Sequence, residues 1–235
     1  MDYKDYTAGA NEDNFYFKGK NNLLEKILQK NFYNLSSQKI LVVGCGTGEE
    51  LGVLNKYGEC HILDNNSAVF DLIHENAYKK KYIGDACALP FQRDTFDLVV
   101  ALDVLEHIKN HQIAIKEIFR VLRKGGHFIF SVPAYTFLYS AHDKALMHHR
   151  RYNINDIKTL IRGFTTNLFY WNSILFLPIA LLRILKKKSM GVDNLTLPKA
   201  LNFILTRTLL LENLLIIKGF KFPFGLSIVG VCRKN

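Results

Sequence analysis

Apolar and polar positions follow two different spacings along the chain. In residues 21–35, apolar side chains recur three and four positions apart from Leu23 to Leu28, which predicts an amphipathic helix. The next run, "KILVVG" at residues 39–44, is continuously apolar after its first residue. Such a run is typical of a strand that is buried on both faces of a parallel sheet.

Apolar runs of this kind return further along the chain. They are "CHILD" at residues 60–64, "FDLVVALD" at 96–103 and "GHFIFSV" at 126–132. A helical pattern at residues 111–126 precedes the last of them, and its closing glycine pair predicts the end of that helix. Strands that alternate with helices predict an α/β fold with a parallel sheet, in which ligands bind at the carboxyl ends of the strands.

The pattern changes in the last third of the chain. "FTTNLFYWNS" at residues 164–173 predicts a strand, and the last apolar strand, "GLSIVGVCR", comes only at residues 225–233. The stretch between them is rich in Leu, Ile and Phe. It predicts two or three helical pieces, with breaks at Pro178, Gly191 and Pro198.

Two segments of this stretch are strongly apolar. Residues 173–185 are too few for a membrane span, which needs about 20 apolar residues. Because Lys186–Lys188 follow, an interfacial membrane helix fits this segment, and a helical cap or a dimer contact is the alternative. In the second segment, residues 199–219, Arg207 and Glu212 are expected to be buried among leucines.

The charge of the chain is unevenly distributed. Of the net charge of +10, residues 150–235 supply 14 Lys/Arg against 3 Asp/Glu, whereas residues 1–149 hold 17 against 18. A basic second half favours contact with nucleic acid, anionic lipid or a phosphorylated substrate. Composition does not choose among these three. Because the sequence has no interleaved aromatic and basic platform and no recognisable RNA-binding module, no nucleic acid is expected, and an anionic membrane surface is one candidate partner.

Cysteine usage and the N-terminal composition bear on the compartment. The chain has 4 cysteines with no CxxC spacing, namely Cys45, Cys60, Cys87 and Cys232. This pattern predicts neither a zinc site nor a disulfide framework and fits a reducing cytoplasm. The acidic, polar first 15 residues do not look like a secretory signal. A cytoplasmic protein is expected, with a peripheral position on the cytoplasmic membrane face as an option.

Glycines follow the first predicted strand closely. "VVGCGTG" places Gly44, Gly46 and Gly48 where the chain turns towards a helix, as a close approach of backbone to a ligand requires. The spacing differs from the dinucleotide fingerprint GxGxxG, whose third glycine would fall at Glu49, and this counts against NAD.

Aspartates stand at the ends of the following strands. Asp64 ends "HILD", where its carboxylate can accept hydrogen bonds from both hydroxyls of a ribose. Asp85 lies in "YIGDACALPF", and Asp103 follows the fourth strand. Taken singly, Asp64 could instead cap a helix and Asp85 could form a turn.

This ordered set resembles the class I S-adenosylmethionine-dependent methyltransferases. The resemblance rests on "VVGCGTG", "GDACALPF", "FDLVVALDVLEHI" and "RVLRKGGHFIFSVP" and covers residues 40–133. It implies a Rossmann-like, seven-stranded, mostly parallel sheet with helices on both faces and a helical insert before the last strand. It also implies S-adenosylmethionine as cofactor and S-adenosylhomocysteine as product.

The resemblance also implies which residues hold the cofactor. Gly44, Cys45, Gly46 and Gly48 would border the methionine part, Asp64 and Asn65 the ribose, Asp85 and Ala86 the adenine, and Leu102 and Asp103 would lie beside the ligand. His107, in "LEHI", is expected to pack or to cap near the site rather than to take part in the chemistry.

The acceptor side is expected in "AHDKALMHHRRY", residues 141–152, which follows the fifth strand. His142 or His148 could accept a proton, with Asp143 orienting an imidazole. Arg150 or Arg151 could clamp an anionic group, and Tyr152 completes this set. The alternative is structural, with an arginine bracing the following helix through carbonyls or Asp143. Two histidines and an aspartate can also bind a metal, but methyl transfer does not require one and none is expected.

Further pieces resemble a bacterial and archaeal branch of these enzymes that is thought to modify surface glycans or lipid-linked intermediates. They include "NFYFKGK" at residues 14–20, from which Tyr16 and Lys20 are expected to contact the substrate, although the branch more often has Trp and Arg at these two positions. A small-molecule, glycan or lipid-linked acceptor methylated at a hydroxyl is therefore the leading hypothesis. A quinone-like ring, an RNA-modifying or RNA-binding protein, and a non-catalytic cofactor-binding regulator are the alternatives.

The expected organisation has four parts. Residues 1–38 form a helical lid, 39–172 the cofactor-binding core, 173–222 an apolar, basic helical insert and 223–235 the final strand of the core. The sequence carries no signal for an oligomeric state.

Overall fold

Strands from the whole length of the chain build one sheet. The computed structural model describes residues 14–32, 38–185 and 197–235. Within them, a 7-stranded sheet has the order β3-β2-β1-β4-β5-β7-β6. The strands are β1 (Gln38–Val43), β2 (Gly58–Asp64), β3 (Lys80–Ile83), β4 (Phe96–Leu102), β5 (Leu122–Pro133), β6 (Phe164–Trp171) and β7 (Ser227–Lys234). Only β7 runs antiparallel to its neighbours, β5 and β6. The predicted Rossmann-like, mostly parallel sheet is confirmed.

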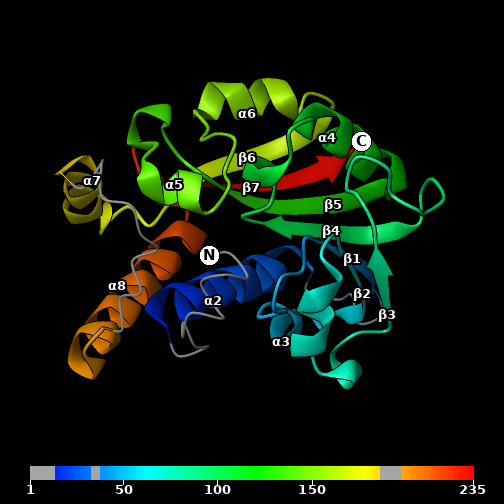
Figure 1. The fold of residues 1–235 in the computed structure, drawn as a ribbon, viewed down its shortest axis with the longest axis horizontal. Helices are drawn as coiled ribbons and strands as arrows, with labels where there is room; N and C mark the ends of the chain where they lie inside the picture. Colours follow the sequence, from blue (N-terminus) through cyan, green and yellow to red (C-terminus); the bar gives the residue numbers. More distant parts are fainter. Residues whose placement is uncertain (1–13, 33–37, 186–196) are drawn as a thin grey trace.

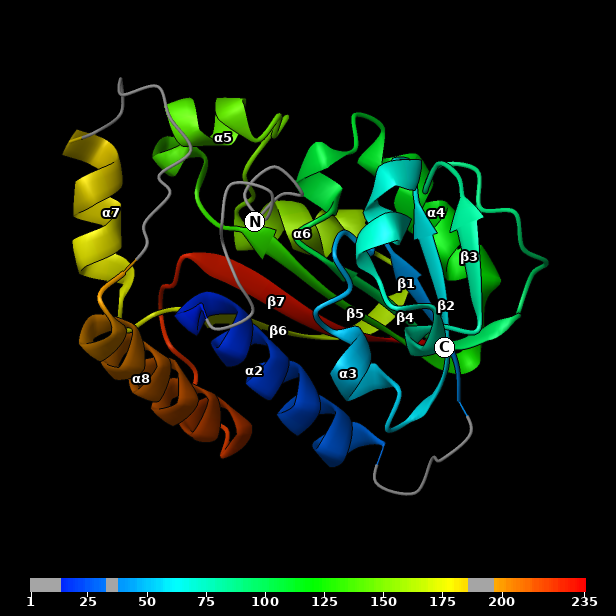
Figure 2. The same cartoon turned by 60° about the horizontal axis from the view of Figure 1, so that its bottom comes forward.

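Helices cover both faces of the sheet (Figures 1 and 2). On one face lie α2 (Phe15–Asn31), α3 (Leu51–Leu54) and α8 (Lys199–Ile217), and on the other α4 (His111–Val121) and α6 (Ile154–Leu160). The short α5 (Ala141–Ala145) and α7 (Phe176–Leu185) lie at one end of the molecule. The described residues also contain short 3₁₀ helices, namely η1 (Ser67–Leu72), η2 (Glu75–Ala77), η3 (Leu105–His107) and η4 (Thr136–Leu138).

The central strands are apolar throughout because both of their faces are buried. In β1, Ile40 and Val42 belong to the cluster beneath α2 and α8, whereas Leu41 and Val43 belong to the cluster beneath α4 and α6. Successive side chains of a strand point to opposite faces, so a continuous apolar run is the sequence signature of a sheet between two helical layers.

Helix α8 packs closely along α2. A Cβ atom added at Gly19 would come within 2.6 Å of Leu209 Cδ1, so the glycine permits this close approach. The fully buried Asn213 joins three elements, because its amide group donates to the Gly19 carbonyl at 2.8 Å and its oxygen accepts from Trp171 Nε1 at 2.9 Å. These hydrogen bonds tie the predicted insert to α2 and to the sheet.

Glu212 is buried, as predicted, and its partners are backbone amides. Its carboxylate accepts from the Ser173 amide at 2.9 Å and from the Ile174 amide at 3.0 Å. The prediction that Arg207 is buried is wrong. Arg207 is exposed and its guanidinium lies 5.1 Å from the centre of the Phe203 ring, because it falls on the outer face of α8.

Three predicted element boundaries are shifted. Helix α2 begins earlier than expected, since Asn14 caps it by accepting from the Tyr16 amide. Helix α4 ends at Val121, before the glycine pair, because Leu122 already pairs with Phe96 in the sheet. The prediction of a break at Pro178 is also wrong.

Pro178 lies in the first turn of α7, where its missing N–H group has no helical partner to lose. The prediction of a break at Pro198, by contrast, is confirmed, because Pro198 is the N-cap residue of α8. The end of the expected helix 21–35, the Lys186–Lys188 cluster and Gly191 lie outside the described residues, as does much of the expected lid.

Replacing Asn213 by Leu tests the junction between α2, α8 and β6. The substitution keeps the branched shape of the side chain but removes both hydrogen bonds, and it leaves the buried N–H group of Trp171 without its partner. We therefore expect the free energy of unfolding to fall by about 2–4 kcal/mol. Chemical denaturation measures this change. The control is Leu211→Ala on the exposed face of the same helix, which should change it by less than about 1 kcal/mol. Equal losses in the two variants would contradict the assignment.

Candidate active site

The glycine loop after β1 has the backbone conformation that its sequence predicts. Gly44, Gly46 and Gly48 have φ angles of 66°, 49° and 75°, which side-chain-bearing residues rarely adopt. A Cβ atom at Gly44 would lie 2.7 Å from Val104 Cγ2. A Cβ atom at Gly46 would meet nothing within 4 Å, so the backbone there borders open space into which a ligand can come close.

Asp64 lies at the end of β2, beside this loop. One of its oxygens accepts from the Gly46 amide at 3.2 Å and the other from the Asn66 amide at 2.9 Å. Each carboxylate oxygen retains capacity for a further hydrogen bond, as two ribose hydroxyls require. Asn66, rather than Asn65 or Asp64, caps the following turn η1. The residues present therefore fit the ribose of a nucleoside cofactor.

The adenine contacts expected at the next strand end lie in a turn. Asp85 is exposed, its carboxylate accepts from the Cys87 amide at 2.8 Å, and its carbonyl accepts from the Ala88 amide at 2.9 Å. Ala86 is buried. The turn-forming role that the sequence left open for Asp85 is present, and its role toward adenine remains a prediction.

Asp103 follows β4 and is surrounded by donors. Its carboxylate accepts from Ser131 Oγ at 2.6 Å, from the Tyr16 hydroxyl at 3.0 Å and from Lys20 Nζ at 3.2 Å. Burial opposes ionisation of Asp103, but Lys20 and the hydrogen bonds outweigh it and hold the pKa of Asp103 well below its usual range. The structure thus brings the two predicted N-terminal residues, Tyr16 and Lys20, to the cofactor side of the site.

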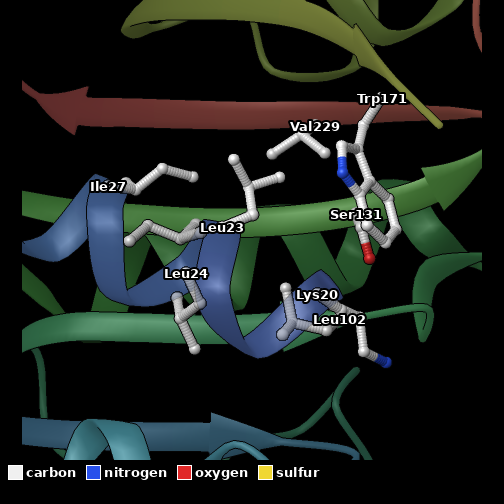
Figure 3. Close-up of a pocket in the computed structure, with 9 residues that line it drawn as sticks. Lys20, Leu23, Leu24, Ile27, Leu102, Ser131, Trp171 and Val229 are labelled. Atoms are coloured by element: carbon white, nitrogen blue, oxygen red, sulfur yellow. The ribbon is translucent and has the colours of Figure 1, made fainter. Parts of the chain in front are cut away.

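A small apolar pocket lies between helix α2 and the sheet next to Asp103 (Figure 3). The side chains that line it are Lys20, Leu23, Leu24 and Ile27 from α2, with Leu102, Ile129, Ser131, Trp171 and Val229 from the sheet. The Tyr16 ring packs 5.2 Å from the Trp171 ring beside it. The predicted contact residue Leu102 therefore borders the space between α2 and the strands.

The acceptor segment is organised around Asp143, which is fully buried. Its carboxylate accepts from the Ser140 amide at 2.9 Å and from Arg151 Nε at 2.7 Å, and it lies 3.1 Å from His148 Nδ1. Burial opposes ionisation, but the contacts with His148 and Arg151 keep the pKa of Asp143 well below its usual range. The predicted orientation of an imidazole by Asp143 is seen at His148.

His142 has different surroundings. Burial, followed by the nearby Arg183 charge, lowers the pKa of His142 to about 4. His142 is therefore neutral near neutral pH and a weak proton acceptor.

The remaining residues of the segment hold the backbone in place. Arg151 donates to the Ala134 carbonyl at 3.1 Å, and Arg150 donates to the Ile108 and Lys109 carbonyls, both at 2.9 Å. The buried Tyr152 hydroxyl donates to the Leu105 carbonyl at 2.9 Å. These contacts match the bracing role, and acceptor binding by Arg150, Arg151 and Tyr152 remains a prediction.

Sequence reasoning did not single out Glu106. It lies in η3 just after β4, is 1% exposed, and burial together with the Asp103 charge raises its pKa to about 8. Its neighbour His107 stacks edge-to-face on His148, with ring centres 4.6 Å apart. The sequence did hold a signal for Glu106. A carboxylate and an imidazole, Glu106 and His107, follow the fourth strand closely, and that strand ends at the edge of the sheet where ligands bind.

Comparisons with known proteins agree with this geometry. Residues 41–130 match the family described as "Methyltransferase domain". The chain carries a class I S-adenosylmethionine-dependent methyltransferase domain. The match spans the glycine loop, Asp64, Asp85, Asp103 and Glu106, which are the strand-end positions described above.

Two curated methyltransferases are similar to part of this chain. It is 30% identical over 101 residues to the sterol 24-C-methyltransferase of Candida albicans, which covers 39% of this chain and 27% of that one. It is 33% identical over 115 residues to the demethylmenaquinone methyltransferase of Mycobacterium bovis, which covers 47% of this chain and 48% of that one. The chain thus matches less than two thirds of the length of these relatives.

A solved structure shares the fold of this chain. Phosphoethanolamine N-methyltransferase 2 of Haemonchus contortus, in complex with S-adenosyl-L-methionine, superimposes with a TM-score of 0.60 at 17% identity. The match covers 92% of this chain and 52% of that one. At this identity the likeness shows a shared fold, and it is the match to the methyltransferase family that supports S-adenosylmethionine as the cofactor.

Replacing Asp64 by Ala tests the ribose contact. The variant removes a carboxylate that can accept two hydroxyl groups, so we expect the dissociation constants for S-adenosylmethionine and S-adenosylhomocysteine to rise about tenfold or more. Titration calorimetry measures both constants. Asp71→Ala, in a turn beyond the site, serves as the control and should leave them within about twofold. Unchanged binding by the Asp64 variant would refute the ribose assignment.

Proposed function

We propose that this methyltransferase domain transfers a methyl group from S-adenosylmethionine to a hydroxyl group of a sugar or a lipid-linked intermediate. The observation that carries the proposal is the oriented imidazole of His148, 3.1 Å from the buried Asp143 carboxylate in the segment after β5. Methylation of a hydroxyl, unlike that of a thioether or a tertiary amine, requires removal of a proton, and a carboxylate-oriented imidazole meets that need.

The residues divide the work in the proposed reaction. S-Adenosylmethionine supplies a methyl group on a sulfonium, whose carbon–sulfur bond breaks as the acceptor oxygen bonds to the carbon, leaving neutral S-adenosylhomocysteine. Asp143 holds Nδ1 of His148, so Nε2 faces the acceptor and draws away the hydroxyl proton. Asp143 then stabilises the charged imidazole, while the bracing contacts of Arg151 keep the pair in position.

A quinone-like ring is the second candidate acceptor. One relative, the demethylmenaquinone methyltransferase of Mycobacterium bovis, matches 47% of this chain. A ring acceptor methylated at oxygen would use the same proton acceptor. Assays with a polyprenyl-linked sugar and with a demethylated quinone separate the two candidates.

An exposed apolar surface on α7 and α8 supports a membrane-associated acceptor. Figures 1 and 2 place both helices at one end of the molecule. Large apolar side chains point outward there: Ile174 43%, Leu177 69%, Leu181 57%, Ile184 51%, Leu201 42%, Phe203 59%, Ile204 59%, Leu211 55% and Leu214 45% exposed. Monomeric soluble proteins rarely expose apolar side chains in such number on adjoining elements.

Basic side chains accompany this α7–α8 surface. Lys199, Arg207, Lys218 and Lys221 are exposed on or just after α8. Within the described residues, α8 is also the one helix whose length and composition would allow it to cross a bilayer. Its packing on α2 and its buried Asn213 favour an interfacial position instead. We propose that the surface binds the anionic cytoplasmic face of a membrane, where a lipid-linked acceptor resides.

Histidine substitutions test the proposed chemistry. His148→Ala removes the oriented imidazole and should lower turnover by about 10²- to 10⁴-fold while the affinity for S-adenosylmethionine stays within about twofold. His142→Ala should have a smaller effect, because the His142 imidazole has a low pKa and is a weak acceptor. Methyl-transfer assays and calorimetry provide the two readouts. A fall in cofactor affinity with the fold intact would assign the segment to a cofactor lid instead.

Charge introduced into the apolar surface tests membrane binding. The double variant Leu181→Glu/Phe203→Glu should lose flotation with anionic liposomes at low salt, because burying two carboxylates in the interface is costly. The control Ile113→Glu alters a residue of α4 that is 46% exposed on the other face of the sheet, and it should float like the unmodified protein. If the unmodified protein itself did not float, membrane association would be excluded.

A further inference from the structure

Metal-binding atoms gather beside the acceptor segment. Glu106 and His107 in η3, and His148 from the loop after α5, each offer a ligand atom, and these atoms all lie within 4.8 Å of one another. The three residues come from two segments that are far apart in the sequence. The His149 amide holds the segments together by donating to the Glu106 carbonyl at 2.9 Å.

Glu106 carries a buried oxygen that accepts no hydrogen bond from the described part of the chain. Among the described residues, Glu106 Oε2 is buried and has no hydrogen-bond partner, and the whole residue is 1% exposed. An unsatisfied buried carboxylate oxygen is costly, so a cation or a donor at this point would repay its burial. No lysine or arginine pairs with Glu106 among the described ion pairs.

His148 is oriented as a metal ligand requires. Its Nδ1 lies 3.1 Å from Asp143, so Nε2 is the nitrogen available on the other side of the ring. A carboxylate on the far nitrogen is the usual support of a ligating histidine, since it fixes the ring and raises its basicity. Asp143 is in turn held by Ser140 and Arg151, so the supporting group is itself fixed.

We propose that Glu106, His107 and His148 bind a divalent transition-metal ion, of which Zn²⁺, Mn²⁺ and Co²⁺ are examples. One carboxylate and two imidazoles form a ligand set suited to these ions. Because metal–ligand bonds are about 2.0–2.2 Å, two ligand atoms on one ion are at most about 4 Å apart. The side chains therefore need to move together by less than about 1 Å.

The proposed ion rests on the proposed methylation of a hydroxyl group and changes the role given to His148 in that reaction. Three protein ligands leave a coordination position open, and an oxygen of the acceptor fits there. Coordination lowers the pKa of the acceptor hydroxyl, which releases its proton to water before the oxygen attacks the methyl carbon. His148 then acts as a ligand that Asp143 orients, rather than as the proton acceptor itself. This assignment replaces the expectation of no metal, which considered the histidines of residues 141–152 with Asp143 and left Glu106 out.

Metal titration tests the site directly. Untagged protein, freed of metal with EDTA, is titrated with Zn²⁺ and Mn²⁺ by calorimetry and with Co²⁺ by visible absorption. We expect one ion per chain and a Co²⁺ spectrum typical of nitrogen and oxygen ligands. Glu106→Gln and His148→Ala should each weaken binding at least tenfold, whereas His149→Ala, which changes an exposed neighbour, should not. Far-UV circular dichroism checks the fold, and His148→Ala carries the test if the buried Glu106 variant does not fold.

The outcomes separate this inference from the proposed function. No binding, or binding that Glu106→Gln and His148→Ala leave unchanged, would overturn the metal site. If methyl transfer to a hydroxyl acceptor then persisted in EDTA, the proposed function would stand with His148 as the proton acceptor. If metal binds as expected, EDTA should abolish turnover and Mn²⁺ or Zn²⁺ should restore it, while calorimetry with S-adenosylmethionine stays unchanged.

Discussion

The buried carboxylate of Asp103 is the interaction on which the site depends. Asp103 follows β4 directly with a φ angle of 56°, and its carboxylate accepts hydrogen bonds from Ser131 on the neighbouring strand and from Tyr16 and Lys20 on α2. A charge buried in this way is tolerated only because three donors surround it. Since two of the donors, Tyr16 and Lys20, come from α2, the N-terminal helix must lie over the strand ends for the core to be stable. The cofactor side and the helical cover are therefore one unit.

The buried carboxylates near the site are satisfied to different degrees. Asp103 has a lysine, a tyrosine and a serine, and Asp143 has an arginine, a histidine and a backbone amide. Glu106, which lies between them in the sequence, has an oxygen without a partner within the described residues. Asp103 and Asp143 have structural roles, because their hydrogen-bond partners come from separate elements. Glu106 has no such partner for its Oε2 atom among the described residues, and this difference points to a bound ligand at Glu106.

The strands and the site residues at their ends were predictable from the sequence for physical reasons. Strands buried on both faces must be apolar throughout, so "KILVVG" and "FDLVVALD" could not be mistaken for surface elements. Likewise, Asp64 and Asp103 end strands, and strand ends of a parallel sheet meet at the ligand edge. What the sequence could not predict is tertiary choice. Two partners of Asp103, Tyr16 and Lys20, lie more than 80 positions away in the sequence. Arg207 is exposed and Glu212 is buried because they occupy different faces of α8.

Helix α8 shows why composition alone misjudges this insert. Its inner face carries Glu212 and Asn213, both fully buried, and its outer face carries Phe203, Ile204 and other exposed apolar side chains. This is the reverse of a soluble surface helix, whose polar residues face water. Burying polar groups inward is stable here because backbone amides, Gly19 and Trp171 satisfy them. An outer face with so many exposed apolar side chains favours contact with another apolar phase, and the exposed Lys199, Arg207, Lys218 and Lys221 favour an anionic one. Helix α8 therefore has two roles. Its inner face holds α2 in place over the strand ends, and its outer face presents the surface proposed to bind the membrane that carries a lipid-linked acceptor. Both roles follow from the same inward placement of its polar side chains.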